Sequence, residues 1–382
     1  MSQAVYINDI QAFLPNEAVD NSNIEAVLGQ VGPRPSRAKR MILRSNKIKT
    51  RHYALDIETR QSTHTNAQLA AEAIRKLDRS DFNINTIDLL ACGTTLPDQL
   101  MPNHALMVHG ELKIPSCEVI ATSGICLSAT MALKYAYLSV LSGESQNAVA
   151  TGSENSSSAM RAENFSQEIE TRVDALEQAP EIAFEKDFLR WMLSDGAGVA
   201  RLSAQPNSQG ISLKIDWIFQ KSYADKLDAC MYAGAQKQED GSLKGWREFT
   251  QDEWLQDSIS SVKQDVKQLN ENIIEYTVTK PLEELVGSGK LDPSVIDYYL
   301  PHYSSGFFRD KVYAGMQKAG CDIVQEKWFT NLESKGNTGS ASIFIILEEL
   351  FHSGKLKAGD KLLCYVPESG RFSTAFMQLE VV

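Results

Sequence analysis

The stretch ATSGICLSA at residues 121–129 sets a single cysteine, Cys126, between two different apolar patterns. The residues before it, from Cys117, predict a short strand, and those from Leu127 to Leu141 predict one buried helix. Cys126 is therefore expected at a strand-to-helix turn. There the free N–H groups of a helix end favour a thiolate and can hold an oxyanion. The alternative is a buried structural cysteine.

Strands and helices alternate on both sides of this turn. Strands are predicted over 5–13, 87–92, 147–152 and 193–202, and helices over 68–77 and 102–112. Beyond a polar seam at 203–210, strands are predicted over 211–219, 295–300, 361–366 and 372–381, with helices over 254–286 and 343–351. The acidic segment 161–190 is expected to be an insertion or a lid. The pattern indicates an α/β protein and is compatible with a duplicated architecture whose halves are 1–204 and 205–382.

The composition is typical of a soluble globular protein, with 382 residues, 43% of them hydrophobic, and a formal net charge of −11. This acidity argues against general nucleic-acid binding. The first residues show no secretion signal and no apolar run is long enough to cross a bilayer, so a cytoplasmic protein without a membrane segment is expected. Six scattered cysteines, without CxxC pairs or Cys/His clusters, indicate neither disulfides nor a metal site.

One stretch reverses the acidic charge. It carries eight cations and no acidic residue, namely Arg34, Arg37, Lys39, Arg40, Arg44, Lys47, Lys49 and Arg51. Such a cluster on an acidic protein suits an anionic partner, whether phosphate, acidic protein or acidic lipid, and a solvated loop is the equally weighted alternative.

Two polar residues far downstream can work with the cysteine. His302 follows the predicted strand 295–300, and Asn337 lies in a glycine-flanked loop before the helix 343–351. An imidazole and an amide can respectively carry or donate a proton and donate a hydrogen bond. Taken singly, His302 could be a core histidine and Asn337 a helix cap.

In order and spacing, four motifs resemble the thiolase-fold ketosynthases of the β-ketoacyl-ACP synthase III type. They are Ser123–Ala129, Ser194–Gly198, Pro301-His302 and GNTGSAS at 336–342. The resemblance covers nearly the whole chain and implies a five-layered αβαβα fold of two similar halves, in a homodimer. It implies acyl transfer onto Cys126, with acyl-ACP or acyl-CoA thioesters as substrates and no further cofactor.

The resemblance also implies roles for single residues. The backbone N–H groups of Cys126 and Gly370 would form the oxyanion hole, and His302 and Asn337 would donate hydrogen bonds to the enolate of the second thioester. The basic stretch fits an acyl carrier protein. Met101 would reach across the dimer into the acyl pocket of the neighbouring subunit, the alternative being core packing.

Together with PESGRF at 367–372 and Gly152-Ser153-Glu154, these motifs look most like the cyclising ketosynthases of dialkylresorcinol and stilbene pathways. Such enzymes join a β-ketoacyl and an α,β-unsaturated acyl group into a cyclohexane-1,3-dione by Claisen condensation and Michael addition. Glu154 is the candidate base, the alternative being a structural bond to backbone N–H groups. A decarboxylating synthase III, a cysteine hydrolase and a non-catalytic partner subunit are the competing interpretations.

Overall fold

The structure is a computed structural model and describes residues 4–31, 39–165, 189–257 and 259–382. Nine strands in these ranges form one sheet in the order β13-β14-β15-β8-β1-β7-β6-β4-β5. Their bounds are β1 Tyr6–Phe13, β4 Leu89–Thr94, β5 Glu118–Ser123, β6 Ala148–Glu154, β7 Gly196–Ser203, β8 Leu213–Ser222, β13 Tyr298–Pro301, β14 Lys361–Glu368 and β15 Ser373–Val381.

The sheet consists of two halves with the same topology. From the centre outwards, one half runs β1-β7-β6-β4-β5 and the other β8-β15-β14-β13. In both, the two inner pairings are antiparallel and the next is parallel. Where β5 pairs with β4, a parallel bridge joins Trp328 to Tyr299 of β13. Strand β6 therefore corresponds to β14, and β4 to β13.

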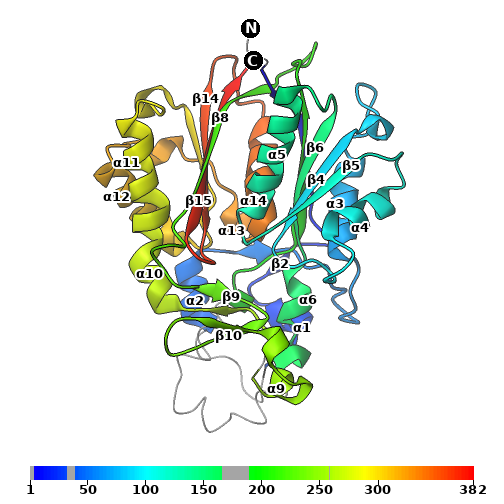
Figure 1. The fold of residues 1–382 in the computed structure, drawn as a ribbon, viewed down its shortest axis with the longest axis vertical. Coiled ribbons are helices and arrows are strands. Elements are labelled where there is room, and N and C mark those ends of the chain that lie inside the picture. The colour runs from blue at the N-terminus through cyan, green and yellow to red at the C-terminus, as the bar shows by residue number, and fades with distance from the viewer. Residues whose placement is uncertain (1–3, 32–38, 166–188, 258) are drawn as a thin grey trace.

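Helices form three layers around the two half-sheets (Figure 1). Helices α5 (Ser128–Ser142) and α14 (Ser342–Phe351) lie between the half-sheets. On the outer faces lie α3 (Asn66–Arg75) and α4 (His104–Leu112) on one side, and α10 (Val266–Ile274), α11 (Lys280–Gly287) and α12 (Arg309–Lys318) on the other. This order of layers is αβαβα, so the predicted fold class is confirmed.

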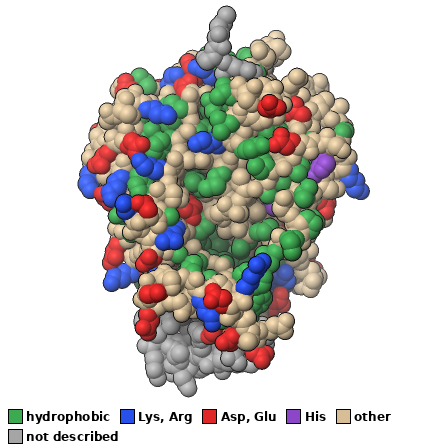
Figure 2. Space-filling model, viewed as in Figure 1, with side chains coloured by type: hydrophobic (Ala, Val, Ile, Leu, Met, Phe, Trp, Pro, Cys, Tyr) green, Lys and Arg blue, Asp and Glu red, His purple; other side chains and the backbone are tan. Residues whose placement is uncertain are grey.

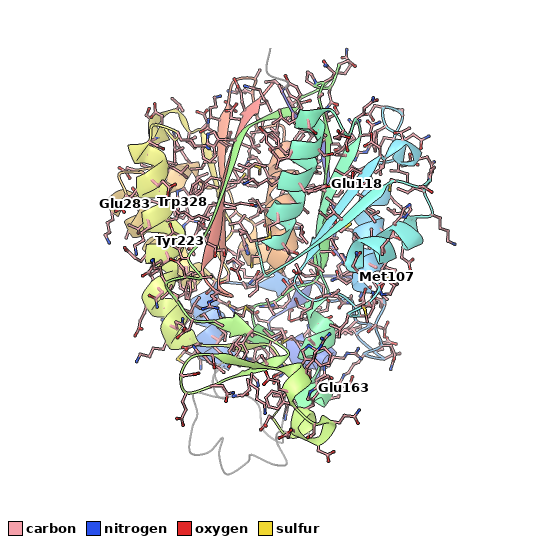
Figure 3. The ribbon with its side chains drawn as sticks, in the orientation of Figure 1. Met107, Glu118, Glu163, Tyr223, Glu283 and Trp328 are labelled. Carbon is pink, nitrogen blue, oxygen red and sulfur yellow. The ribbon has the colours of Figure 1, made fainter. Side chains whose placement is uncertain are left out.

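Three hydrophobic cores hold these layers together. The central core surrounds α5 and α14; in α14, seven of the ten residues of SIFIILEELF are buried. Burial of one Leu, Ile or Phe side chain contributes about 1.5–3 kcal/mol. The outer cores lie under α3 and α4 and under α10–α12, where Figure 3 labels Met107 and Trp328 respectively.

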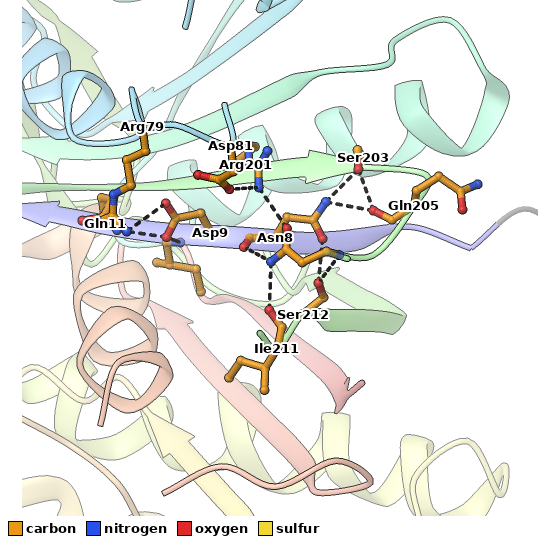
Figure 4. A network of polar contacts seen from close by, with 12 residues as sticks. Asn8, Asp9, Gln11, Arg79, Asp81, Arg201, Ser203, Gln205, Ile211 and Ser212 are labelled. Atoms are coloured by element: carbon orange, nitrogen blue, oxygen red, sulfur yellow. Dashed lines mark hydrogen bonds and ion pairs between the residues drawn. The ribbon is translucent and has the colours of Figure 1, made fainter. Parts of the chain in front are cut away.

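A polar network ties the two halves together at the β1–β8 seam, where only two residue pairs are in register. The Asn8 Nδ2 of β1 donates to Ser203 Oγ at 2.8 Å and to the Gln205 carbonyl at 2.9 Å (Figure 4). Its Oδ1 accepts from Ser212 Oγ at 2.8 Å. The connection between the halves is thus fastened to β1 at both ends. The division at residue 204 falls within it and stays a prediction.

The predicted helix over 254–286 is wrong in extent. The chain instead forms α9 (Gln251–Gln256), the short strand β12 (Lys263–Gln264), α10, a π-helical turn at Glu275–Thr279, and α11. Two contacts set the break: Gln264 pairs with Met231, and Asp265 caps α10 by accepting from the Gln268 N–H. The predicted lid lies largely at 166–188, outside the described residues.

Smaller elements complete the described ranges, in which no helix is long and apolar enough to cross a membrane. They are β2 (Val19–Asp20), α1 (Ile24–Leu28), α2 (Lys39–Asn46), β3 (Thr50–Arg51), α6 (Ser156–Met160), β9 (Met231–Tyr232), β10 (Ala235–Lys237), β11 (Leu243–Gly245) and α13 (Leu332–Lys335), with short 3₁₀ turns between.

Candidate functional site

Cys126 lies in the turn between β5, which ends at Ser123, and α5, which begins at Ser128. The turn is closed by the Ser128 N–H, which donates to the Ile125 carbonyl at 3.2 Å. The first turn of α5 packs directly on the sheet, because Gly152 of β6 leaves room for it. A Cβ at Gly152 would lie 2.5 Å from Ala129 Cβ and 2.7 Å from the Ser340 carbonyl. One glycine thus lets the cysteine turn and the loop of Asn337 approach each other.

His302 is held by the strand that precedes it. Its backbone N–H donates to the Tyr365 carbonyl at 2.8 Å, which extends the β13–β14 ladder by one residue. The side chain is buried, and its Nε2 has no hydrogen-bond partner among the described residues. Burial lowers the pKa of His302 to about 4, so the imidazole is neutral at physiological pH. A buried ring nitrogen without a partner is a group held ready for a ligand.

Asn337 is oriented by its own loop. Its Oδ1 accepts from the Gly339 N–H at 3.0 Å, so the Nδ2 group remains available as a donor. Its backbone donates to Met192 and accepts from Ser194 at 3.1 and 2.8 Å, which anchors the loop to the segment before β7.

Two cavities meet at Cys126. The central cavity, about 60 Å³, is lined by Cys126, Glu154 and Asn337. The inner cavity, about 40 Å³, is lined by Cys126 and His302, and both cavities share Ser304 and Ser369. The three residues predicted to act together, Cys126, His302 and Asn337, therefore converge on adjoining cavities although they come from both halves of the chain.

Glu154 occupies the end of β6, where its Oε1 accepts three hydrogen bonds. The donors are the Thr95 N–H at 2.9 Å, the Thr95 hydroxyl at 2.5 Å and the Ser340 N–H at 3.2 Å. The bracing role considered from the sequence is thus present, while the side chain also lines the central cavity. Burial raises the pKa of Glu154 to about 7, against the opposing effect of these bonds.

The Cys126 thiol does not have the lowered pKa expected of a helix end. Burial is the largest cause of its raised pKa, followed by the charges of Glu154 and Glu368. The effect of the helix end is confined to its first turn, and here desolvation and two carboxylates outweigh it. Without bound substrate, the nucleophile is a protonated thiol.

Glu368 was missed by the sequence analysis, although PESGRF had been noted. It is the last residue of β14 and is buried. Its Oε1 accepts from the Gly370 N–H at 2.6 Å, which is the group predicted as an oxyanion donor. That donor is therefore already occupied. The available signal was a carboxylate placed directly after a buried strand.

The basic stretch divides into exposed and structural residues. Arg40, Arg44, Lys47 and Lys49 are exposed. Lys39 is paired with Glu25 at 2.6 Å, and Lys49 is paired with Glu333. Arg34 and Arg37 lie outside the described residues.

Arg51 corrects the predicted carrier-binding set. It is fully buried and donates to Asn21 Oδ1 at 2.8 Å and to the Trp191 carbonyl at 3.1 Å. A buried guanidinium with intramolecular partners cannot contact a carrier protein.

Met101 is 84% exposed, which excludes the core-packing alternative. Its neighbour Leu100 is 73% exposed. Hydrophobic side chains are also visible over α5 and β5 on the face shown in Figure 2, where Tyr135 and Leu138 of α5 are exposed. Strand β5 is an edge strand of the sheet. The role of Met101 across a dimer stays a prediction.

Asp195, within the motif DGAG, is structural. Its two oxygens accept from the Ala54 N–H at 2.7 Å and the Ser157 N–H at 2.9 Å. Burial raises its pKa to about 6. In the described ranges, no group of three or more His, Cys, Asp or Glu residues could hold a metal ion.

Comparisons with known proteins can now be set beside this geometry. Residues 288–373 match the family model described as 3-oxoacyl-[acyl-carrier-protein (ACP)] synthase III C terminal. The β-ketoacyl-[acyl-carrier-protein] synthase III of Sulfurovum sp. is 25% identical over 359 residues, covering 93% of this chain and 89% of the relative. That of Clostridium perfringens is 25% identical over 352 residues, covering 92% and 91%.

Solved structures share the fold over the full chain. The tetronic acid condensing enzyme AbyA1 has a TM-score of 0.75 and 22% identity, covering 98% of this chain and 99% of its own. Xanthomonas campestris OleA, solved with lauric acid and lauroyl-CoA bound, has a TM-score of 0.72 and 18% identity, covering 100% of both chains. The motifs, the thiolase fold and the curated relatives together support the assignment of this chain to the condensing ketosynthases related to β-ketoacyl-[acyl-carrier-protein] synthase III.

Proposed function

We propose that this chain loads an acyl group onto Cys126 and joins it to a β-ketoacyl thioester, closing a cyclohexane-1,3-dione ring by Claisen condensation and Michael addition. Such rings are precursors of dialkylresorcinols and stilbenes. One observation carries the proposal: Cys126 lies where two cavities meet, and their walls offer an imidazole, an amide and a carboxylate from both halves of the fold.

The first step is thioester exchange. The Cys126 sulfur attacks the acyl carbonyl, a new C–S bond forms, and the departing carrier thiol takes the proton that the Cys126 thiol loses. The N–H groups of Cys126 and Gly370 stabilise the tetrahedral oxyanion. For Gly370 to do so, its N–H has to leave the Glu368 oxygen on which it now rests.

The second step needs an enolate. Glu154 takes a proton from a carbon next to a carbonyl of the β-ketoacyl group, and the raised pKa of this carboxyl suits a base that works near neutral pH. His302 and Asn337 donate hydrogen bonds to the enolate oxygen. A neutral imidazole has one N–H, so this role requires the proton on the unpartnered Nε2. The Nδ2 of Asn337 is left free because Gly339 holds Oδ1.

Space for two acyl chains supports a condensation rather than a hydrolysis. The inner cavity has apolar walls from α10, α12 and β14, including Ile273, Val312 and Tyr365. A separate open groove of about 450 Å³ shares Ile125 and Val262 with the central cavity. Two apolar spaces on either side of one nucleophile suit two acyl groups. OleA, with lauric acid and lauroyl-CoA, is a fold relative whose title names acyl ligands.

The substrates are delivered as acyl carrier protein or coenzyme A thioesters, and the chain needs no other cofactor. The exposed cations Arg40, Arg44 and Lys47 support contact with an acidic carrier. The chain acts as a homodimer, in which the edge of β5 and the exposed Leu100 and Met101 are covered by a second copy.

The function is tested by supplying the purified protein with a β-ketoacyl thioester and an enoyl thioester, and separately with a malonyl thioester. Mass spectrometry and proton NMR identify the products. We expect a cyclic dione without olefinic protons, and its loss in Cys126→Ala but not in Cys117→Ala, a half-buried thiol before β5. A decarboxylated linear product indicates a plain synthase III, and free acid alone indicates a hydrolase. If no acyl group is ever found on Cys126, the chain is a non-catalytic subunit.

A further inference from the structure

We propose that Glu368 is a second proton acceptor at this site and takes the proton whose removal forms the second carbon–carbon bond. This inference rests on the proposed function, because ring closure removes protons from two different carbons of the β-ketoacyl group.

The two halves of the fold each deliver one carboxylate to Cys126. Glu154 is the last residue of β6 and Glu368 the last residue of β14, and these strands correspond in the duplicated topology. The side chains are buried, with 3% and 8% of the residue exposed. Both charges raise the pKa of the Cys126 thiol, so both act electrostatically on the reacting sulfur.

The two carboxylates face different spaces. Glu154 lines the central cavity beside Cys126 and Asn337, whereas Glu368 lines the open groove beside Ile125 and Gly370. Both spaces are lined by Thr95, Leu96 and Ile125, so they adjoin. A substrate that spans them meets one base in each.

Glu368 has no ion-pair partner within the described ranges. It accepts from the Gly370 N–H at 2.6 Å and from the Ser373 N–H at 3.3 Å, and burial raises its pKa. A buried carboxylate without a paired cation lowers stability, and such groups are found preferentially where a proton is exchanged.

The chemistry balances without an oxidant or reductant. In each bond-forming step a C–H bond of the β-ketoacyl group breaks, its proton goes to a carboxylate, and its electron pair forms a C–C bond. One step expels the Cys126 sulfur, which takes up a proton. The other leaves an enolate on the former enoyl group, which takes up the second proton on carbon. Both carboxylates thereby return to their starting state.

Protonation of Glu368 has a second consequence. A neutral carboxylic acid is a weaker acceptor than a carboxylate, so the Gly370 N–H is held less strongly once the proton has moved. The donor is then available to the oxyanion that forms as the new bond closes.

The competing explanation is that Glu368 only braces the turn at 369–372. Glu368→Gln separates the two, because the amide oxygen still accepts from the Gly370 N–H but cannot take a proton. Glu380→Gln is the matched control, since Glu380 is a carboxylate of the same β-hairpin that pairs with Lys214 and Lys361 away from the cavities.

The experiment supplies Glu368→Gln and the unaltered protein with enoyl and β-ketoacyl thioesters and follows three readouts: acylation of Cys126, formation of one C–C bond, and ring closure. We expect Cys126 to be acylated, and a singly bonded intermediate to accumulate, either released with its olefinic protons or retained on Cys126. Ring formation should fall at least about 100-fold. Glu154→Gln should stop before the first bond.

Ring formation by Glu368→Gln within about threefold of the unaltered protein overturns the inference, as does loss of Cys126 acylation, which indicates a bracing role. If the unaltered protein itself releases only singly bonded products, the proposed cyclisation fails and Glu368 has no second proton to accept. That result is distinct, because it appears without any substitution.

Discussion

The backbone N–H of Gly370 lies 2.6 Å from Oε1 of Glu368, so an oxyanion donor and a buried carboxylate are bound to each other in the absence of substrate. A carboxylate oxygen there occupies the kind of position that a reaction oxyanion requires. Catalysis therefore depends on how easily the two groups separate.

Gly370→Ala tests this contact. A Cβ at Gly370 would lie 2.1 Å from Glu368 Oε1 and 2.9 Å from Ile125 Cδ1, so the carboxylate has to move. We expect product formation to fall by about 10²–10³, the usual effect of losing an oxyanion donor. Gly287→Ala is the control, because nothing lies within 4 Å of its Cβ position. Steady-state kinetics of both variants decide, and equal rates contradict the role of Gly370.

The pH dependence of condensation should report Glu154. Burial raises the pKa of Glu154 to about 7 and lowers that of His302 to about 4. A base works only when deprotonated, so the rate should fall as the pH decreases through about 7, where His302 remains neutral. Glu154→Gln should remove this acidic limb together with most of the rate, and rate profiles between about pH 5.5 and 9 measure it.

Unfolding does not explain such an acidic limb. A carboxyl whose folded pKa is raised from 4.5 to about 7 contributes stability that is fully present below pH 4.5 and is lost as the pH rises through 7. The Glu154 contribution therefore stabilises the fold at the pH at which the rate declines. An unchanged limb in Glu154→Gln would assign the titration to another group.

The Cys126 thiol should react slowly with iodoacetamide at pH 7, because burial and two carboxylates raise its pKa. Removing either charge by Glu154→Gln or Glu368→Gln should lower that pKa and increase the alkylation rate by roughly 3- to 10-fold. Peptide mass spectrometry isolates Cys126 from the other cysteines, and Glu380→Gln serves as the control. Slower alkylation in both variants contradicts this account of the thiol.

Met101→Trp should change the preferred acyl chain length, if the exposed Met101 enters the pocket of a second copy. Competition between acyl thioesters of different length measures the preference. Leu243→Trp, another exposed apolar position, is the control for added surface bulk. An unchanged preference in a protein that is still dimeric removes this role from Met101.

The double variant Arg40→Glu/Arg44→Glu should raise KM for substrates carried by an acyl carrier protein by about 10-fold at low salt, and less at high salt. With short pantetheine thioesters the rate should stay unchanged, because they lack the acidic carrier. Lys357→Glu, an exposed cation outside this cluster, controls for net charge. Equal effects on both substrate types argue against a carrier surface.

Local patterns predicted much of this molecule. The turn carrying Cys126 was predicted because an apolar strand and an apolar helix differ in period within a few residues. Strand β13 could be predicted before His302 in the same way. The helix over 254–286 failed as a prediction because Gln264 pairs with Met231, a residue more than thirty positions earlier. Long-range pairing overrides helical propensity there.

The sequence by itself determined the alternation of strands and helices, the cysteine turn and the motif resemblance, because each depends on neighbours a few residues apart. Only the tertiary structure decided that Arg51 is buried rather than exposed, that Glu368 joins Glu154 beside the thiol, and that the Cys126 pKa is raised rather than lowered. Burial and electrostatic contact arise between segments brought together by the duplicated fold, and their energies depend on distance in space, not along the chain.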